Sequence, residues 1–196
     1  AALKPLQGDE KYVFTERDIA GILYFDLKMS DSATHVLETT IAQFGNVYKK
    51  PVAECKMMLG DILLAQGESI EAIFKYMEVE RAFNGTPLGD EAKFMKAKVA
   101  YFTLDFPWAL SQFEVLKSST TKLISNDALQ MALLISDNST EDTLFQGLSY
   151  YAKADLYQFR NMPDSAIATL NLLLAVFPEH AIKAEAMLLQ ANLYYK

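Results

Sequence analysis

The sequence predicts an all-α protein of about ten helices arranged as antiparallel hairpins. Apolar residues recur three and four positions apart along most of the chain, the spacing of one helix face. In each expected hairpin a small residue on the first helix is followed twelve positions later by alanine on the second. Helices approach closely where both carry small side chains, so this interval indicates a repeated contact. The repeat positions are Gly21 and Ala33, Gly60 and Ala72, Ala97 and Ala109, Ala154 and Ala166, and the unpaired Ala191.

The first part of the chain is expected to hold three hairpins within a single domain that covers residues 1–196. Residues 1–14 have mixed polarity and no helical spacing, so we expect a lead-in. Residues 15–117 form the hairpins: the first folds back around Ser30, the second at Gly67 and the third at Pro107. The prolines from Pro51 onward fall between helical segments, where a missing amide hydrogen does no harm.

The second part contains an insertion and an incomplete repeat. Residues 118–142 hold one inserted helix, about 125–136, with Ser125, Asn126 or Asp127 available as its cap. Residues 143–178 form the fourth hairpin, and 179–196 form the first helix of a truncated fifth repeat. The chain begins without methionine and ends inside a helical pattern, so we expect a fragment of a longer protein.

Composition excludes several classes of function. A net charge of −7 and a pI near 4.9 argue against nucleic-acid binding, which needs clustered Lys and Arg. No apolar run reaches the roughly 18 residues needed to span a bilayer, so membrane insertion is not expected. The lone Cys55 excludes an internal disulfide, and we interpret it as a buried small hydrophobe.

No constellation of residues indicates catalysis. His35 and His180 are far apart and lack metal-ligand spacing, and Cys55 has no evident base. We interpret both histidines as partly exposed helix residues. Asp61 and Asp155 could act as paired carboxylates, but nothing near them in the sequence would separate their pKa values. The sequence therefore predicts a protein that is not an enzyme and has no metal and no cofactor.

The repeat resembles the tetratricopeptide repeat, whose pattern is a bulky residue, Leu-Gly, Tyr, then Ala with Phe four positions on, then Pro. The interval between copies is 37 to 39 residues, where the family's is usually 34, except between Ala97 and Ala154, where the inserted helix lengthens it to 57. The unit after Phe177 and Pro178 is similar to that of bacterial cell-envelope members, of the outer-membrane assembly lipoprotein and Tol-Pal partner types. The matching residues are Leu59, Gly60, Ala72 and Tyr76 in the second hairpin, and Tyr150, Ala154, Tyr157, Ala166, Leu170 and Pro178 in the fourth.

The resemblance implies a right-handed α-solenoid, a superhelix whose first helices line a concave groove for a peptide or partner segment. It also implies a non-enzymatic scaffold for protein–protein interaction, with a role in bacterial envelope biogenesis and a periplasmic or envelope location favoured over a cytoplasmic one. The implied groove residues are Phe25, Asp26, Met57, Asp61, Leu64, Phe94, Lys98, Tyr101, Phe102, Tyr151, Asp155 and Phe159.

Other interpretations stay open at this point. The chain could be a purely structural segment of a larger solenoid or an oligomerisation module. In that case the face of the last helix that carries Leu188, Leu189 and Leu193 would be covered by further repeats or would pair in a homodimer. A glycan-binding component of helical nutrient-capture type is a third possibility, for which Trp108 is the only candidate platform.

Overall fold

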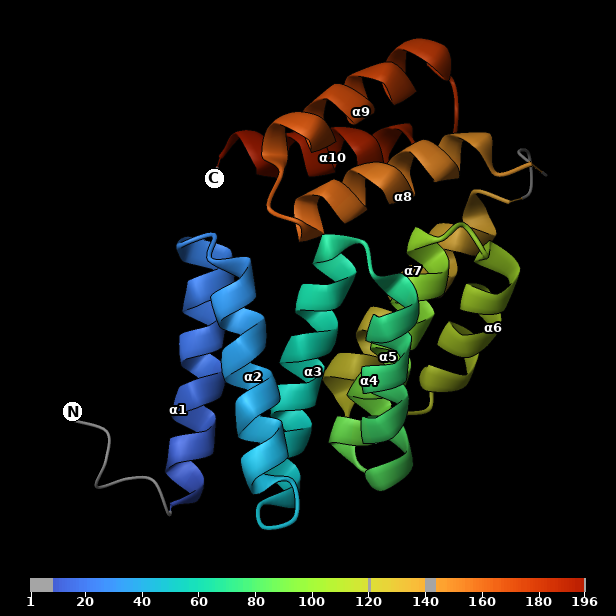
Figure 1. Cartoon of the computed structure of the whole chain (residues 1–196). Helices are drawn as coiled ribbons and strands as arrows, with labels where there is room; N and C mark the ends of the chain where they lie inside the picture. The colour runs from blue at the N-terminus through green and yellow to red at the C-terminus, as the bar shows by residue number, and fades with distance from the viewer. Residues whose placement is uncertain (1–8, 120, 140–143, 196) are drawn as a thin grey trace. The chain divides into compact units, whose positions relative to one another are not determined.

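The computed structural model describes residues 9–119, 121–139 and 144–195, and within these ranges every regular element is helical (Figure 1). The prediction of an all-α protein of about ten helices is confirmed, with sequentially adjacent helices packed in pairs. Residues 1–8 of the expected lead-in, and 140–143 and 196, lie outside the described residues. The chain forms two compact units, Ala1–Phe83 and Asn84–Lys196, and each is taken by itself below.

The first unit contains two helical hairpins. Each helix packs against the next, and the first helix also packs against the third (Figure 1). An ion pair between Arg17 and Glu54 joins the first helix to the third. The elements are α1 (Glu10–Gly21), η2 (Ile22–Asp26), α2 (Ser30–Phe44), α3 (Lys49–Gln66) and α4 (Ser69–Ala82).

The second unit continues the pattern with one additional helix. The elements are α5 (Pro87–Phe102), α6 (Phe106–Leu116), α7 (Lys122–Asp137), α8 (Gln146–Phe159), α9 (Pro163–Val176) and α10 (Lys183–Tyr194). Helices α5 and α6 form a hairpin, as do α8 and α9. The inserted helix α7 packs on both α5 and α6, α8 packs on α5, and α10 packs on α9.

The turns inside the hairpins have a common geometry. A residue with positive φ lies seven positions after the small residue of each hairpin: Lys28 (57°), Gly67 (97°), Leu104 (68°) and Asn161 (55°). In the last three hairpins the next backbone N–H donates to the carbonyl five residues back, from Glu68 to Leu63, Asp105 to Ala100 and Met162 to Tyr157, over 2.8–2.9 Å. This is the hydrogen bond of a Schellman helix end. The repeat read from the sequence is therefore also a repeat of backbone geometry.

The first hairpin departs from this geometry. Its first helix ends in the π-helical turn η2, where the Leu27 N–H donates to the Ile22 carbonyl over 3.1 Å. The following bond, from Met29 to Leu23, spans six residues instead of five. The apolar spacing of this stretch is that of a regular α-helix, because a π-turn leaves no mark in apolar spacing.

Gly60 lies in close contact with the second helix of its hairpin. A Cβ at Gly60 would lie 2.6 Å from Cε1 of the Tyr76 ring on α4. Tyr76 is fully buried, and its hydroxyl donates to Asp61 Oδ1 over 2.8 Å, so the ring is held in place. The corresponding pairs combine alanine with another large residue: Ala97 with Phe113, and Ala154 with Leu170. All four of these residues are fully buried.

Several helix boundaries differ from the sequence-based expectation. Helix α1 begins at Glu10 instead of 15, because Asp9 caps it by accepting from the Lys11 N–H, so part of the expected lead-in is helical. Helix α7 is capped by Thr121 and not by Ser125, Asn126 or Asp127. Helix α8, the first helix of the fourth hairpin, begins at Gln146, three residues later than expected. Helix α10, the first helix of the truncated fifth repeat, begins at Lys183, four residues later than expected.

Leu104 offers a test of the turn geometry. A branched side chain in the left-handed region costs about 1–2 kcal/mol, and Leu104 is 48% exposed, so it recovers little by packing. The equivalent residue of the fourth hairpin is Asn161, and asparagine tolerates this conformation. Leu104→Asn should therefore raise the free energy of unfolding, measured by urea denaturation, by about 0.5–1 kcal/mol. The control Leu104→Ala keeps the unfavourable φ and should stay near wild type. Equal effects of Asn and Ala would contradict the assigned turn.

Candidate functional site on α5 and α8

In the first unit, most of the expected groove residues are buried, hydrogen-bonded inside a hairpin or displaced by a π-turn, so they do not form a binding surface. Met57 and Leu64 are buried. Asp61 accepts the hydrogen bond from the buried Tyr76, so one of its oxygens is used within the hairpin. Phe25 and Asp26 lie in the π-turn η2, where the helical register behind their assignment no longer applies. These five positions therefore form no continuous polar or aromatic surface.

In the second unit, six of the expected residues come together on two packed helices, α5 and α8. Spacings of three and four place each set on one face of its helix. Phe94, the remaining expected residue of α5, instead packs its ring against buried Phe113 of α6, with centroids 5.4 Å apart. The six residues are Lys98, Tyr101 and Phe102 on α5 and Tyr151, Asp155 and Phe159 on α8, and we call them the α5–α8 site.

Aromatic rings form the apolar part of the α5–α8 site. Phe102 lies against Phe159 with ring centroids 5.9 Å apart, and Tyr101 lies 5.5 Å from Phe102. Tyr101 also contacts Phe106 at the start of α6, with centroids 5.7 Å apart. Tyr101 and Phe102 are buried, whereas Phe159 and Tyr151 are half-buried. Solvent therefore reaches the aromatic part of the site mainly at the rings of α8, and Phe159 of α8 packs on the buried Phe102 ring of α5.

Lys98 and Asp155 supply the charges of the site. The Lys98 ammonium lies 5.0 Å from the centroid of the Phe102 ring, a cation–π arrangement. Burial raises the pKa of the Asp155 carboxyl above its usual range, and the positive charge of Lys98 opposes this shift. Burial also raises the pKa of Tyr151, with the negative charges of Asp155 and Glu185 adding to the effect. The charge of Lys98 therefore does not fully offset the cost of burying the Asp155 carboxylate.

Tyr101 adds an unsatisfied hydroxyl to the site. Its side chain is fully buried, and within the described residues its oxygen has no hydrogen-bond partner. Burial raises the pKa of Tyr101, and the charges of Asp155 and Tyr151 raise it further. A buried hydroxyl without a partner costs about 1–3 kcal/mol, so it marks a point where a polar group could be accommodated.

No family model and no curated protein matches this chain. What it can do is therefore argued from its own residues. Over residues 9–119, 121–139 and 144–195, no helix is both long and apolar enough to cross a membrane. The same ranges contain no group of three or more His, Cys, Asp or Glu side chains arranged to hold a metal ion.

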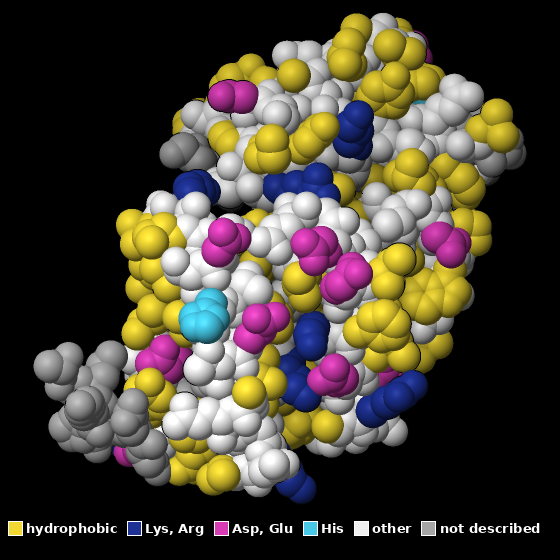
Figure 2. Space-filling model, viewed as in Figure 1, with side chains coloured by type: hydrophobic (Ala, Val, Ile, Leu, Met, Phe, Trp, Pro, Cys, Tyr) yellow, Lys and Arg dark blue, Asp and Glu magenta, His cyan; other side chains and the backbone are white. Residues whose placement is uncertain are grey.

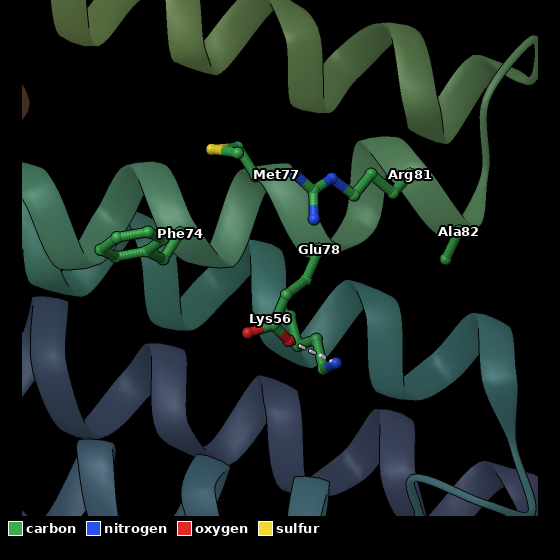
Figure 3. A pocket seen from close by; sticks show the side chains of 6 residues that line it. All are labelled: Lys56, Phe74, Met77, Glu78, Arg81 and Ala82. Carbon is green, nitrogen blue, oxygen red and sulfur yellow. Dashed lines mark hydrogen bonds and ion pairs between the residues drawn. The ribbon is translucent and has the colours of Figure 1, made fainter.

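A second surface feature lies on the first unit and was not among the expected site residues. A depression of about 540 Å³ is lined by one residue of α3 and five of α4 (Figure 3). The helical spacing of Ile70, Phe74, Met77 and Arg81 could have indicated it, because these residues share one face of α4. The lining residues are Lys56, Phe74, Met77, Glu78, Arg81 and Ala82, and we call this feature the α3–α4 depression.

The remaining repeat and surface residues fall as follows. Ala33 and Ala72 are fully buried, as are the alanines of the later hairpins, whereas Gly21 is half-buried and Ala191 is exposed. On α10, Leu188 is 65% exposed, but Leu189 and Leu193 are buried, so the expected bare leucine face is reduced to one leucine.

Trp108 and Cys55 also received a role from the sequence alone. Trp108 is 39% exposed near the start of α6. Cys55 is fully buried, and burial raises its pKa to about 12, which fits an unreactive thiol.

His180 is not a helix residue, contrary to expectation. It lies in the turn between α9 and α10, where its Nδ1 accepts from the Ile182 N–H over 3.1 Å. Its ring packs on α8, because a Cβ at Gly147 would lie 2.7 Å from its Nε2. His180 therefore joins the turn to α8, a role that apolar periodicity could not indicate.

Proposed function

We propose that this protein is a non-enzymatic scaffold that binds a segment of a partner protein at the α5–α8 site. The helical hairpins would stack as a right-handed solenoid of the tetratricopeptide-repeat type, with α5 and α8 among its groove-lining first helices. The resemblance further suggests that the partner belongs to the bacterial cell envelope. Repeated turn geometry and consecutive helix packing support the solenoid part of the proposal.

The Asp155 carboxylate is the observation that carries the proposal. Burial raises its pKa, and the half-buried rings of Tyr151 and Phe159 lie on the same face of α8. An acidic group framed by aromatic rings recognises a cationic side chain, because ion pairing and cation–π attraction act together. We therefore expect the bound segment to carry Lys or Arg, in competition with Lys98.

Selection from a displayed library of random peptides tests this. Peptides enriched on the wild-type protein should carry Lys or Arg beside apolar residues, and their affinity should fall about tenfold or more in Asp155→Asn. The matched control is Asp164→Asn, an exposed aspartate in the first turn of α9, which should bind like wild type. Circular dichroism verifies that both variants stay helical.

Two outcomes would contradict the proposal. Enriched peptides that bind Asp155→Asn as tightly as wild type would remove the α5–α8 site from the interaction. A library that yields no enriched sequence would favour the purely structural alternative, in which these aromatic residues serve the packing of α8 on α5.

A further inference from the structure

The α3–α4 depression differs in charge from the rest of the chain. The whole protein carries a net charge of −7, and Figure 2 shows acidic and basic side chains interspersed over the face in view. The lining of the depression, however, contains two cations, Lys56 and Arg81, and one carboxylate, Glu78. The lining therefore carries one net positive charge in a protein that is acidic as a whole.

Only one of these cations is uncommitted. Glu78 Oε2 accepts from Lys56 Nζ over 2.6 Å, which ties α3 to α4 (Figure 3). Glu78 Oε1 lies 3.8 Å from Lys75 Nζ. Arg81 is exposed, and in the described part of the chain no ion pair involves it. A guanidinium in this state can bind a carboxylate through two parallel hydrogen bonds.

An exposed apolar strip leads along α4 to Arg81. Ile70 is 66% exposed and Phe74 is 58% exposed, and Met77 continues the same face. From Ile70 to Arg81 the strip covers eleven helical steps, roughly 16 Å. Single exposed apolar residues are ordinary, but an aligned strip that ends in a free cation beside a depression matches the helix-in-groove mode of recognition.

We propose that the α3–α4 depression binds an acidic amphipathic segment of another protein. An apolar side chain of that segment packs on Phe74, and an Asp or Glu near one of its ends pairs with Arg81. The charge of the depression selects this occupant over a basic one. The proposal does not depend on the α5–α8 site, which is expected to select basic segments, so either can fail without the other.

Two labelled synthetic peptides of about four helical turns test the proposal by fluorescence anisotropy. Both carry Leu and Phe at helical spacing, and they differ only in one terminal cluster, which is Glu in one peptide and Lys in the other. Each is made in both sequence directions. The Glu peptide should bind wild type about tenfold more tightly than the Lys peptide, with a difference that shrinks at high salt.

Variants assign the binding to the depression. Arg81→Glu should reverse the preference between the peptides, and Phe74→Ser should weaken both. The matched controls are Lys50→Glu and Val47→Ser, exposed residues of the same unit outside the depression, which should leave both affinities unchanged.

Three outcomes would overturn the proposal. The first is that neither peptide binds at millimolar concentration, and the second is that Arg81→Glu retains the wild-type preference. The third is self-association of the wild type, measured by light scattering and abolished by Arg81→Glu, which would assign the depression to a second copy of this chain.

Discussion

Gly60→Leu is expected to lower the free energy of unfolding by about 1–3 kcal/mol, because added side-chain atoms must displace a buried ring. Even the first of those atoms would lie 2.6 Å from Tyr76 Cε1, well inside van der Waals contact. The Tyr76 ring cannot easily move, since it is fully buried and bonded to Asp61. Urea denaturation followed by circular dichroism measures the loss.

The control for this prediction is the equivalent glycine of the first hairpin. A Cβ at Gly21 would meet only the terminal Met58 Cε, at an ordinary 3.5 Å. Gly21→Ala should therefore be neutral or stabilising by up to about 1 kcal/mol, because alanine favours the helical state over glycine. A loss in Gly21→Ala as large as that in Gly60→Leu would contradict this account of the contact.

Asp155→Asn is expected to raise the free energy of unfolding at neutral pH by about 1 kcal/mol. In a chain of this size, that change raises Tm by a few degrees. Burial raises the pKa of Asp155 in the folded state, so the folded protein binds this proton more tightly than the unfolded chain does. The stability that the protonated carboxyl contributes is complete below the ordinary value of 3.8 and is lost as pH rises through the folded-state pKa.

The difference between Asp155→Asn and wild type should therefore shrink toward zero as the pH falls below about 4. It should grow in a Lys98→Ala background, because Lys98 supplies the charge that opposes the shift. Asp26→Asn, at an exposed position, is the control and should change Tm little at any pH. A Tm difference that does not depend on pH would mean that Asp155 is not desolvated.

The stability and binding results for Asp155 can be read together. If Asp155→Asn gains stability and loses affinity for basic peptides, then the carboxylate lowers the stability of the fold and serves recognition. If Asp155→Asn gains stability without losing affinity, the carboxylate lowers the stability of the wild-type fold and has no role in binding basic peptides.

Much of the fold followed from the sequence because helical hairpins are local structures. Spacing of apolar residues located the helices, and the interval from Gly60 to Ala72 located the contact inside a hairpin. Helix ends were harder to place. Asp9 and Thr121 cap their helices through side-chain contacts with nearby N–H groups, and other polar residues nearby were equally plausible caps.

The candidate site was only partly accessible to sequence reasoning. Asp155 and Lys98 were grouped through repeat register, and the structure places them on two packed helices. The same register also selected Leu64 and Tyr101, which are buried, because a repeat pattern does not say how deeply a neighbouring helix covers each position. The spacing of apolar residues along α4 could have indicated the apolar part of the α3–α4 depression, but the pairing of Lys56 with Glu78, which leaves Arg81 without an ion pair among the described residues, joins two helices and is visible only in the structure.

The central claim is that the last three hairpins repeat one contact, between a small residue on the first helix and a large residue on the second. The most direct test is a double-mutant cycle of Gly60→Ala and Tyr76→Leu, which together recreate the Ala154 and Leu170 pair of the fourth hairpin. Each single change should destabilise the protein. The double mutant should be more stable than their sum predicts by about 1 kcal/mol or more, because leucine makes room for the alanine methyl. Additivity within about 0.5 kcal/mol would contradict the claim.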